Sequence, residues 1–149
     1  QIMKGYLKMP EKTAEVIELI DGYRWYRTGD KGHLDEDGFL TIVDRYSRFA
    51  KIGGEMVSLT TVEEEILDAC NDKDLEVAAT CLPDQRKGEK IVLLSTSNIE
   101  KSELKKILSR AKINPLYYPS SILVVDEIPK LGSGKTDFGA TNKIALVNN

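Results

Sequence analysis

A lysine in a glycine-rich stretch is the first residue whose type and surroundings could do chemistry. Residues 129–136 read Pro-Lys-Leu-Gly-Ser-Gly-Lys-Thr, so Lys135 directly follows a glycine. The stretch invites comparison with a phosphate-binding P-loop, but that motif requires glycine where Pro129 stands. What remains is a lysine on a flexible loop. It is either an exposed turn residue or a cation delivered to a phosphate or carboxylate oxygen, a task that suits a compact ammonium on a long stem.

Two other stretches carry groups that suit a nucleotide. Asp30 follows a Thr-Gly turn, and a carboxylate in that setting can accept hydrogen bonds from the hydroxyls of a ribose. Arg45 follows Asp44 and offers a rigid fork of donors for ribose hydroxyls or phosphate. When each stretch is taken alone, an ordinary turn and a surface ion pair are the plainer explanations.

A third stretch contains consecutive glycines, Gly53 and Gly54, followed by Glu55. Such glycines let a backbone approach a ligand closely. The alternative is a bend that leads into the next helix, with Glu55 in solvent. The single histidine, His33, lies beside a turn and is expected to be non-catalytic. We find no metal-ligand cluster, nucleophile elbow or catalytic triad pattern in the sequence.

The elements that must hold these residues are predicted from the hydrophobic pattern. Turn residues at 35–38, followed by an apolar run at 39–43, predict a β-hairpin. Apolar runs at 77–81 and 91–95 predict a second hairpin, and a third strand is predicted at 122–126.

Two helices are predicted by apolar residues that recur on one face. In the first, residues 60–70, Thr60 and Glu63 have the spacing of a capping box. Ser102 is the predicted N-cap of the second. Residues 15–20 fit either a strand or a short helix, and residues 137–149 are weakly helical at best.

This order of elements indicates a small α+β domain, with a central β-sheet flanked by helices and preceded by a β-hairpin segment. The composition changes after Asp44. We therefore predict one part over residues 1–44 and a second domain over residues 45–149. The chain begins at Gln1 rather than Met, which suggests a fragment of a longer protein.

Charge and hydropathy exclude some classes of function. The 149 residues carry a formal net charge of −3, whereas a nucleic-acid-binding domain should show a basic footprint. The longest apolar runs are too short to span a bilayer, and no basic tract favours a membrane surface. Cys70 and Cys81 fall in a predicted helix and a predicted strand, and we expect both to be buried reduced thiols of a cytosolic protein.

Together the stretches have a characteristic order. Gly5-Tyr6, residues 26–30, residues 37–39, Asp44-Arg45, residues 51–55 and residues 132–135 follow one another along the chain. This order resembles that of AMP-forming acyl-CoA synthetases, peptide-synthetase adenylation domains and luciferases, over nearly the whole chain. Residues 48–58 and 131–138 look most like the acyl-ACP synthetase part of bacterial 2-acylglycerophosphoethanolamine acyltransferases.

The resemblance implies a role for each candidate residue. Asp30 matches the aspartate that binds the ribose hydroxyls of ATP. Arg45 matches the arginine that contacts the ribose and phosphate region. Lys135 matches the catalytic lysine that bridges the substrate carboxylate and the α-phosphate during adenylation.

The same resemblance implies a C-terminal lid that changes orientation between two half-reactions. Gly53, Gly54 and Glu55 match the loop that lines the pantetheine channel in the thioester step. The family hinge residue is usually Asp or Lys, and here it is Ser47. Serine can still accommodate the backbone rotation of a hinge.

The implied protein is an acid–thiol ligase. It would convert a fatty acid and ATP to acyl-AMP, and then transfer the acyl group to the phosphopantetheine thiol of acyl carrier protein or CoA. Residues 1–44 would be the end of a large N-terminal adenylation domain. That domain, a partner within the same chain, would bind most of the ATP and its Mg²⁺, so residues 1–149 alone should be inactive.

The implied setting is phospholipid remodelling in the cytoplasm, at the inner face of the bacterial inner membrane through another part of the parent protein. No nucleic acid and no membrane contact are expected for this chain itself. Two alternatives stay open. The chain could be the lid of an aryl- or aminoacyl-activating enzyme, or a non-catalytic binding module with the lid fold. The intact Lys135 argues against the second alternative.

Overall fold

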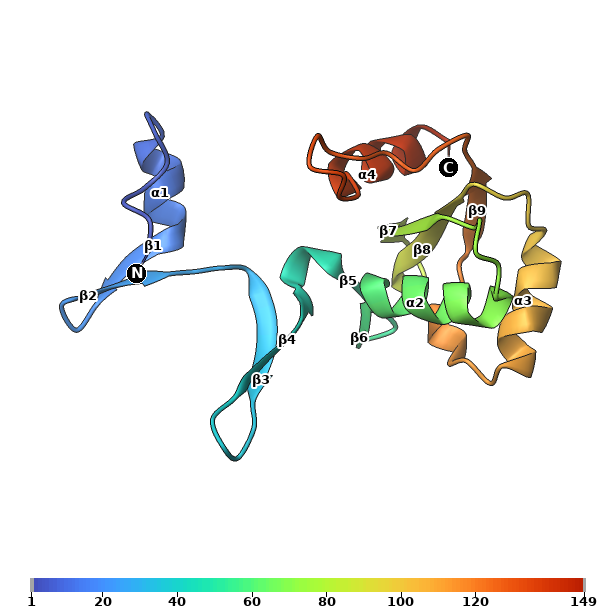
Figure 1. Ribbon diagram of the computed structural model, residues 1–149, viewed down its shortest axis with the longest axis horizontal. Helices are drawn as coiled ribbons and strands as arrows, with labels where there is room; N and C mark the ends of the chain where they lie inside the picture. The colour runs from blue at the N-terminus through green and yellow to red at the C-terminus, as the bar shows by residue number, and fades with distance from the viewer. Residues whose placement is uncertain (1, 149) are drawn as a thin grey trace. The chain divides into compact units, whose positions relative to one another are not determined.

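The computed structural model describes residues 2–148 (Figure 1). The chain divides into two compact units, one ending at Ser47 and the other beginning at Arg48. The composition had placed a boundary after Asp44. The assignment of residues 1–44 to a larger domain and of residues 45–149 to a lid stays a prediction.

The first unit consists of one short helix and two β-hairpins. Helix α1 (Pro10–Val16) leads directly into strand β1 (Ile17–Ile20), so residues 15–20 contain both predicted alternatives. Strand β1 pairs with the aromatic strand β2 (Tyr23–Tyr26) across a turn at Asp21 and Gly22. Both turn residues have positive φ, as a two-residue hairpin turn of type I′ requires.

The second hairpin forms around the turn predicted at residues 35–38. Strands β3 (Asp30–Leu34) and β4 (Leu40–Arg45) are antiparallel, and the 3₁₀ turn η1 (Tyr46–Arg48) follows them. No residue between 2 and 47 is fully buried.

The second unit has a five-stranded sheet with the strand order β6-β5-β8-β7, and β9 pairs in parallel with β8. Its strands are β5 (Phe49–Ile52), β6 (Glu55–Ser58), β7 (Val77–Asp84), β8 (Gly88–Ser95) and β9 (Ser121–Val124). Its helices are α2 (Leu59–Cys70), α3 (Lys101–Arg110) and α4 (Phe138–Val147), with the 3₁₀ turn η2 (Pro115–Tyr117) after α3. The predicted α+β class is confirmed.

Side chains alternate between two hydrophobic clusters along β7 and β8, because successive strand residues point to opposite faces. Ile91 and Leu93 belong to a cluster with α2 and α3. Val92 and Leu94 belong to a second cluster with Ala145 of α4. The sheet therefore carries α2 and α3 on one face and α4 on the other, and Figure 1 shows α4 apart from the other two helices.

Both predicted helices form, but both predicted N-caps were wrong. Ser58, not Thr60, caps α2, because its Oγ accepts the amide N–H of Thr61 at 3.2 Å. Glu63 does not complete a capping box; its carboxylate lies against Arg48 and Ala79 instead. Helix α3 begins at Lys101, so Ser102 lies inside it, and no side chain caps its start.

The C-terminal segment is a full helix, which corrects the expectation of weak helicity at best. Asp137 caps α4 by accepting the amide N–H of Ala140 at 3.0 Å. Thr141 and Ala145 are fully buried on one face of the helix. Packing of these small residues against the sheet holds α4, rather than a wide apolar stripe.

Cys70 ends α2 and Cys81 lies in β7, as predicted, and both are free thiols. They are half-buried rather than fully buried. Among residues 2–148, no helix combines the length and apolarity that a bilayer crossing requires.

Candidate functional site

The structure brings Asp30 and Arg45 together, and it does so through strand register. The two residues lie directly opposite each other at the open end of the β3–β4 hairpin. The Nε of Arg45 lies 3.3 Å from Oδ1 of Asp30. Gly29, with φ +78°, turns the chain into β3, and its carbonyl accepts the amide N–H of Tyr46 at 2.9 Å. The hairpin and this closing hydrogen bond fix both side chains at one place.

This pair is open to solvent. The Arg45 side chain is 71% exposed and that of Asp30 is 28% exposed. An exposed ion pair contributes little to stability, about 0–1 kcal/mol. Its chemical use is different: a carboxylate acceptor and a guanidinium donor stand side by side, which suits ribose hydroxyls and a neighbouring phosphate.

Gly53 and Gly54 form the turn of a tight hairpin between β5 and β6. Their φ angles are +60° and +92°, in the left-handed region that glycine reaches without strain. The amide N–H of Gly53 donates to the carbonyl of Lys87 at 2.9 Å, which ties this turn to the β7–β8 turn. Glu55 is exposed and begins β6. The glycines therefore shape a hairpin turn and not a bend at a helix start.

Lys135 lies on a short closed loop just before α4. Lys130 and Thr136 form an isolated β-bridge at the base of the loop. Inside the loop, the amide N–H of Leu131 donates to the carbonyl of Lys135 at 2.7 Å. The Lys135 side chain is exposed, and the described residues offer its ammonium no hydrogen bond or ion pair. The structure thus presents a free cation on a backbone that is held in place.

Ser47 is exposed in the turn η1 and is the last residue of the first unit. Its role as a hinge stays a prediction. Within the second unit, no described hydrogen bond or ion pair connects the Lys135 side chain with Gly53, Gly54 or Glu55.

The sequence analysis missed a buried ion pair next to Ser47. Arg48 is 4% exposed, and its Nη2 donates to Oε2 of Glu63 at 2.6 Å. Its guanidinium carbon lies 3.7 Å from the ring centroid of Phe138. No local pattern could have predicted these contacts, since Arg48, Glu63 and Phe138 meet only in the folded chain.

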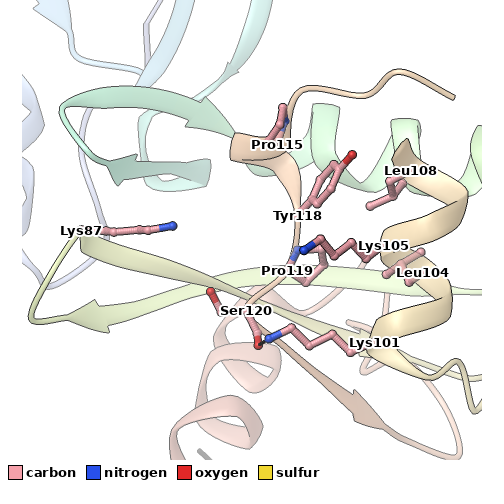
Figure 2. Close-up of a pocket in the computed structure, with 9 residues that line it drawn as sticks. All are labelled: Lys87, Lys101, Leu104, Lys105, Leu108, Pro115, Tyr118, Pro119 and Ser120. Carbon is pink, nitrogen blue, oxygen red and sulfur yellow. Dashed lines mark hydrogen bonds between the residues drawn. The ribbon is translucent and has the colours of Figure 1, made fainter. Parts of the chain in front are cut away.

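A pocket with a volume of about 210 Å³ lies beside α3 and contains none of the predicted site residues. Figure 2 shows its three lysines, Lys87, Lys101 and Lys105, with Tyr118 among its apolar lining. Lys101 donates to the backbone carbonyl of Ser120. No acidic side chain lines the pocket, so its charge suits an anionic group rather than a cation.

The environment of Cys81 disfavours its thiolate. Burial raises the pKa of its thiol to about 11, and the neighbouring carboxylate of Glu89 adds to the effect. Burial also raises the pKa of Cys70. Neither thiol is activated, since a nucleophilic cysteine needs a lowered pKa.

Residues 2–148 contain no group of three or more His, Cys, Asp or Glu side chains that could hold a metal ion. We assign no chemical step to a metal on this chain.

No family model matches the chain. It is 37% identical over 141 residues to 4-coumarate–CoA ligase 2 of Nicotiana tabacum, covering 91% of this chain and 24% of that protein. It is 33% identical over 139 residues to a long-chain-fatty-acid–CoA ligase of Bacillus subtilis, covering 91% of this chain and 24% of the relative.

Among solved structures, ATP-bound MatB from Rhodopseudomonas palustris superposes with a TM-score of 0.73 at 25% identity. The match covers 95% of this chain and 28% of MatB. The chain thus spans about a quarter of the length of the proteins it matches. It has the sequence and the fold of the C-terminal region of AMP-forming acyl- and aryl-CoA ligases, in the adenylate-forming superfamily.

Proposed function

We propose that this chain is the lid of an ATP-dependent ligase that activates a fatty acid and passes it to a thiol. In the first half-reaction, a carboxylate oxygen attacks the α-phosphorus of ATP, and pyrophosphate leaves. In the second, a thiolate attacks the acyl carbon of the adenylate, and AMP leaves with both bonding electrons. The acceptor would be the phosphopantetheine thiol of acyl carrier protein or of CoA.

The observation that carries this proposal is the exposed, unpaired ammonium of Lys135 on its closed loop. Two anions must meet in the first half-reaction, so a cation placed between them lowers the barrier electrostatically. A loop held at its base, by the bridge between Lys130 and Thr136, limits the reorganisation that this placement costs.

The remaining roles follow from the same proposal. Asp30 would accept the ribose hydroxyls, and Arg45 would donate to the ribose and phosphate. Gly53, Gly54 and Glu55 would line the pantetheine channel during the thioester step. Ser47 would be the hinge between the two lid orientations.

Exposed apolar side chains support the assignment of residues 1–44 to a larger domain. Leu7 is 87% exposed, Tyr23 74% and Phe39 71%, although the two hairpins themselves are regular. Large apolar side chains that the unit leaves in solvent are expected where further chain covers them.

The acyl substrate and the biological setting are the finer part of the proposal. The resemblance of the residues around Gly53 and Gly132 to the acyl-ACP synthetase part of bacterial 2-acylglycerophosphoethanolamine acyltransferases supports a fatty acid as the substrate, in a phospholipid-remodelling acyltransferase. The match to 4-coumarate–CoA ligase favours a second candidate, an aryl acid passed to CoA. Adenylation assays with a fatty acid and with an aryl acid separate the two.

The test is Lys135→Ala in the full-length ligase. We expect ATP–pyrophosphate exchange to fall about 10²–10³-fold, the usual cost of one lost electrostatic donor. Transfer of the acyl group from supplied acyl-adenylate to the thiol should change far less. Equal losses in both half-reactions would refute the bridging role of Lys135. Exchange by residues 1–149 alone would show that this chain is not merely a lid.

A further inference from the structure

A buried arginine at the edge of the sheet joins two elements of the second unit. Nη1 of Arg48 donates to the carbonyl of Ala79 at 2.7 Å, and Nη2 donates to Oε2 of Glu63 at 2.6 Å. Oε1 of Glu63 accepts the amide N–H of Ala79 at 2.6 Å. The ion pair thus binds both backbone polar groups of one residue in β7, in the place that a neighbouring strand would take. It holds α2 against β7.

The same arginine also contacts α4. Its guanidinium carbon lies 3.7 Å from the ring centroid of Phe138, the first residue of that helix. A cation over an aromatic face is attracted to it, more strongly where water is excluded. Farther along α4, Nδ2 of Asn142 donates to the carbonyl of Cys81 at 3.2 Å. Asn142 also donates to Oγ1 of Thr80 at 2.8 Å, so α4 is attached to β7 along its length and Arg48 contacts its first residue.

The start of α4 is also the end of the Lys135 loop. Asp137, the residue before Phe138, donates its amide N–H to the carbonyl of Pro129 at 2.8 Å, which closes the loop. Thr136 forms the β-bridge at its base. Because only two residues separate Lys135 from Phe138, a shift of the aromatic ring moves the base of the loop.

We propose that Arg48 is a positioning residue for Lys135 and acts through the ring of Phe138. This inference rests on the adenylation role proposed for Lys135. Arg48 directly follows Ser47, the predicted hinge residue. Rotation at Ser47 would then carry Arg48, Phe138 and the Lys135 loop as one rigid body, so the ammonium arrives at the substrate already in place.

The test uses two substitutions of Phe138 in the full-length ligase, since this residue touches neither substrate nor nucleotide in the proposed roles. Phe138→Leu removes the aromatic face and keeps an apolar side chain. Phe138→Tyr keeps the ring, and the 40% exposure of Phe138 leaves room for a hydroxyl. A misplacement of about 1 Å can cost about 10²-fold in rate. We expect Phe138→Leu to lower ATP–pyrophosphate exchange about tenfold, and Phe138→Tyr to change it less than about twofold.

Two further readouts separate positioning from general stability. Thioester formation from supplied acyl-adenylate should stay within about twofold in Phe138→Leu, because only the first half-reaction needs the placed ammonium. Arg48→Lys keeps a charge for Glu63 but loses the planar stacking group. The double variant Arg48→Lys/Phe138→Leu should lower exchange no further than the worse of the two single variants. The reason is that each substitution removes the same contact, the one between the guanidinium and the ring.

Unchanged exchange in Phe138→Leu, equal loss of both half-reactions, or additive losses in the double variant would overturn the inference. The result for Lys135→Ala tells which idea has failed. If Lys135→Ala retains exchange, the proposed function is wrong. If Lys135→Ala loses exchange but Phe138→Leu does not, the role of Arg48 alone is wrong.

Discussion

At the scale of single residues, the environment of Cys81 makes it an inert thiol. Its pKa of about 11 lies above the ordinary value of 9.0, because burial and the Glu89 carboxylate both disfavour the thiolate. The thiolate is the reactive species, so at pH 8 its fraction should be about a hundredfold below that of an ordinary cysteine. Iodoacetamide should therefore label Cys81 slowly. The test uses the Cys70→Ser variant, in which Cys81 is the remaining cysteine. Its rate of labelling is measured in buffer and again in urea that unfolds the chain. Equal rates in the two conditions would contradict it.

The same pKa shift sets a direction for stability against pH. The unfolded chain releases the Cys81 proton near pH 9, whereas the folded chain keeps it until about pH 11. Between these values the folded state binds more protons, so the free energy of unfolding falls as the pH rises. Cys81→Ser should flatten this part of the profile.

The carboxylate of Glu63 is expected to matter more for stability than any exposed charge. Glu63→Gln leaves the Arg48 guanidinium buried without its counter-charge, which typically costs about 3–5 kcal/mol. Glu64 is the matched control, since it neighbours Glu63 on α2 and is exposed. Glu64→Gln should change the free energy of unfolding by less than about 0.5 kcal/mol. Urea unfolding followed by circular dichroism measures both, and similar values for the two variants would refute the role of the ion pair.

At the scale of elements, the start of α2 offers a direct test of which residue caps it. Ser58→Ala removes the hydroxyl that accepts the amide N–H of Thr61, and should lower the free energy of unfolding by about 1 kcal/mol. Thr60→Ala removes the cap that the sequence pattern had favoured, and should cost less than about 0.5 kcal/mol. The comparison is made by urea unfolding. A larger loss of unfolding free energy for Thr60→Ala than for Ser58→Ala would show that Thr60 caps the helix.

The misplaced cap shows which information a local pattern contains. Thr60 and Glu63 have the spacing of a capping box, but Glu63 is taken by Arg48 and Ala79, which are distant in sequence. The hairpin of β7 and β8 was predictable because its apolar runs and turn are local. Helix α4 was not, because it is held by two small buried residues, Thr141 and Ala145, rather than an apolar stripe.

The candidate site likewise has features that the sequence predicted and others that it could not predict. Asp30 and Arg45 were named from separate stretches, and the hairpin register that makes them partners follows from the turn between them. The composition of the Lys135 loop already allowed an exposed lysine, which was one of the two explanations drawn from the sequence. The support for that loop from Arg48 and Phe138 was invisible in the sequence, because a tertiary contact across 90 positions leaves no local periodicity.

At the scale of the whole molecule, the two units differ in the interactions that stabilise them. Every residue that the structure shows as buried lies in the second unit, where two hydrophobic clusters cover both faces of the sheet. The described part of the first unit has hairpins and one short helix but no buried residue. Isolated two-stranded hairpins are marginally stable at best in water. The two units should therefore behave differently when they are separated.

We expect residues 48–149 alone to fold cooperatively, and residues 1–47 alone to lack a cooperative transition. A hydrophobic core must offset the conformational entropy of about 1–2 kcal/mol per ordered residue. Among residues 2–148, the core clusters lie in the second unit. Urea unfolding of the two fragments, followed by circular dichroism and amide NMR dispersion, gives the answer. A cooperative transition in residues 1–47 would show that the hairpins are stable unaided. It would also remove the argument that their exposed apolar side chains require further chain to cover them.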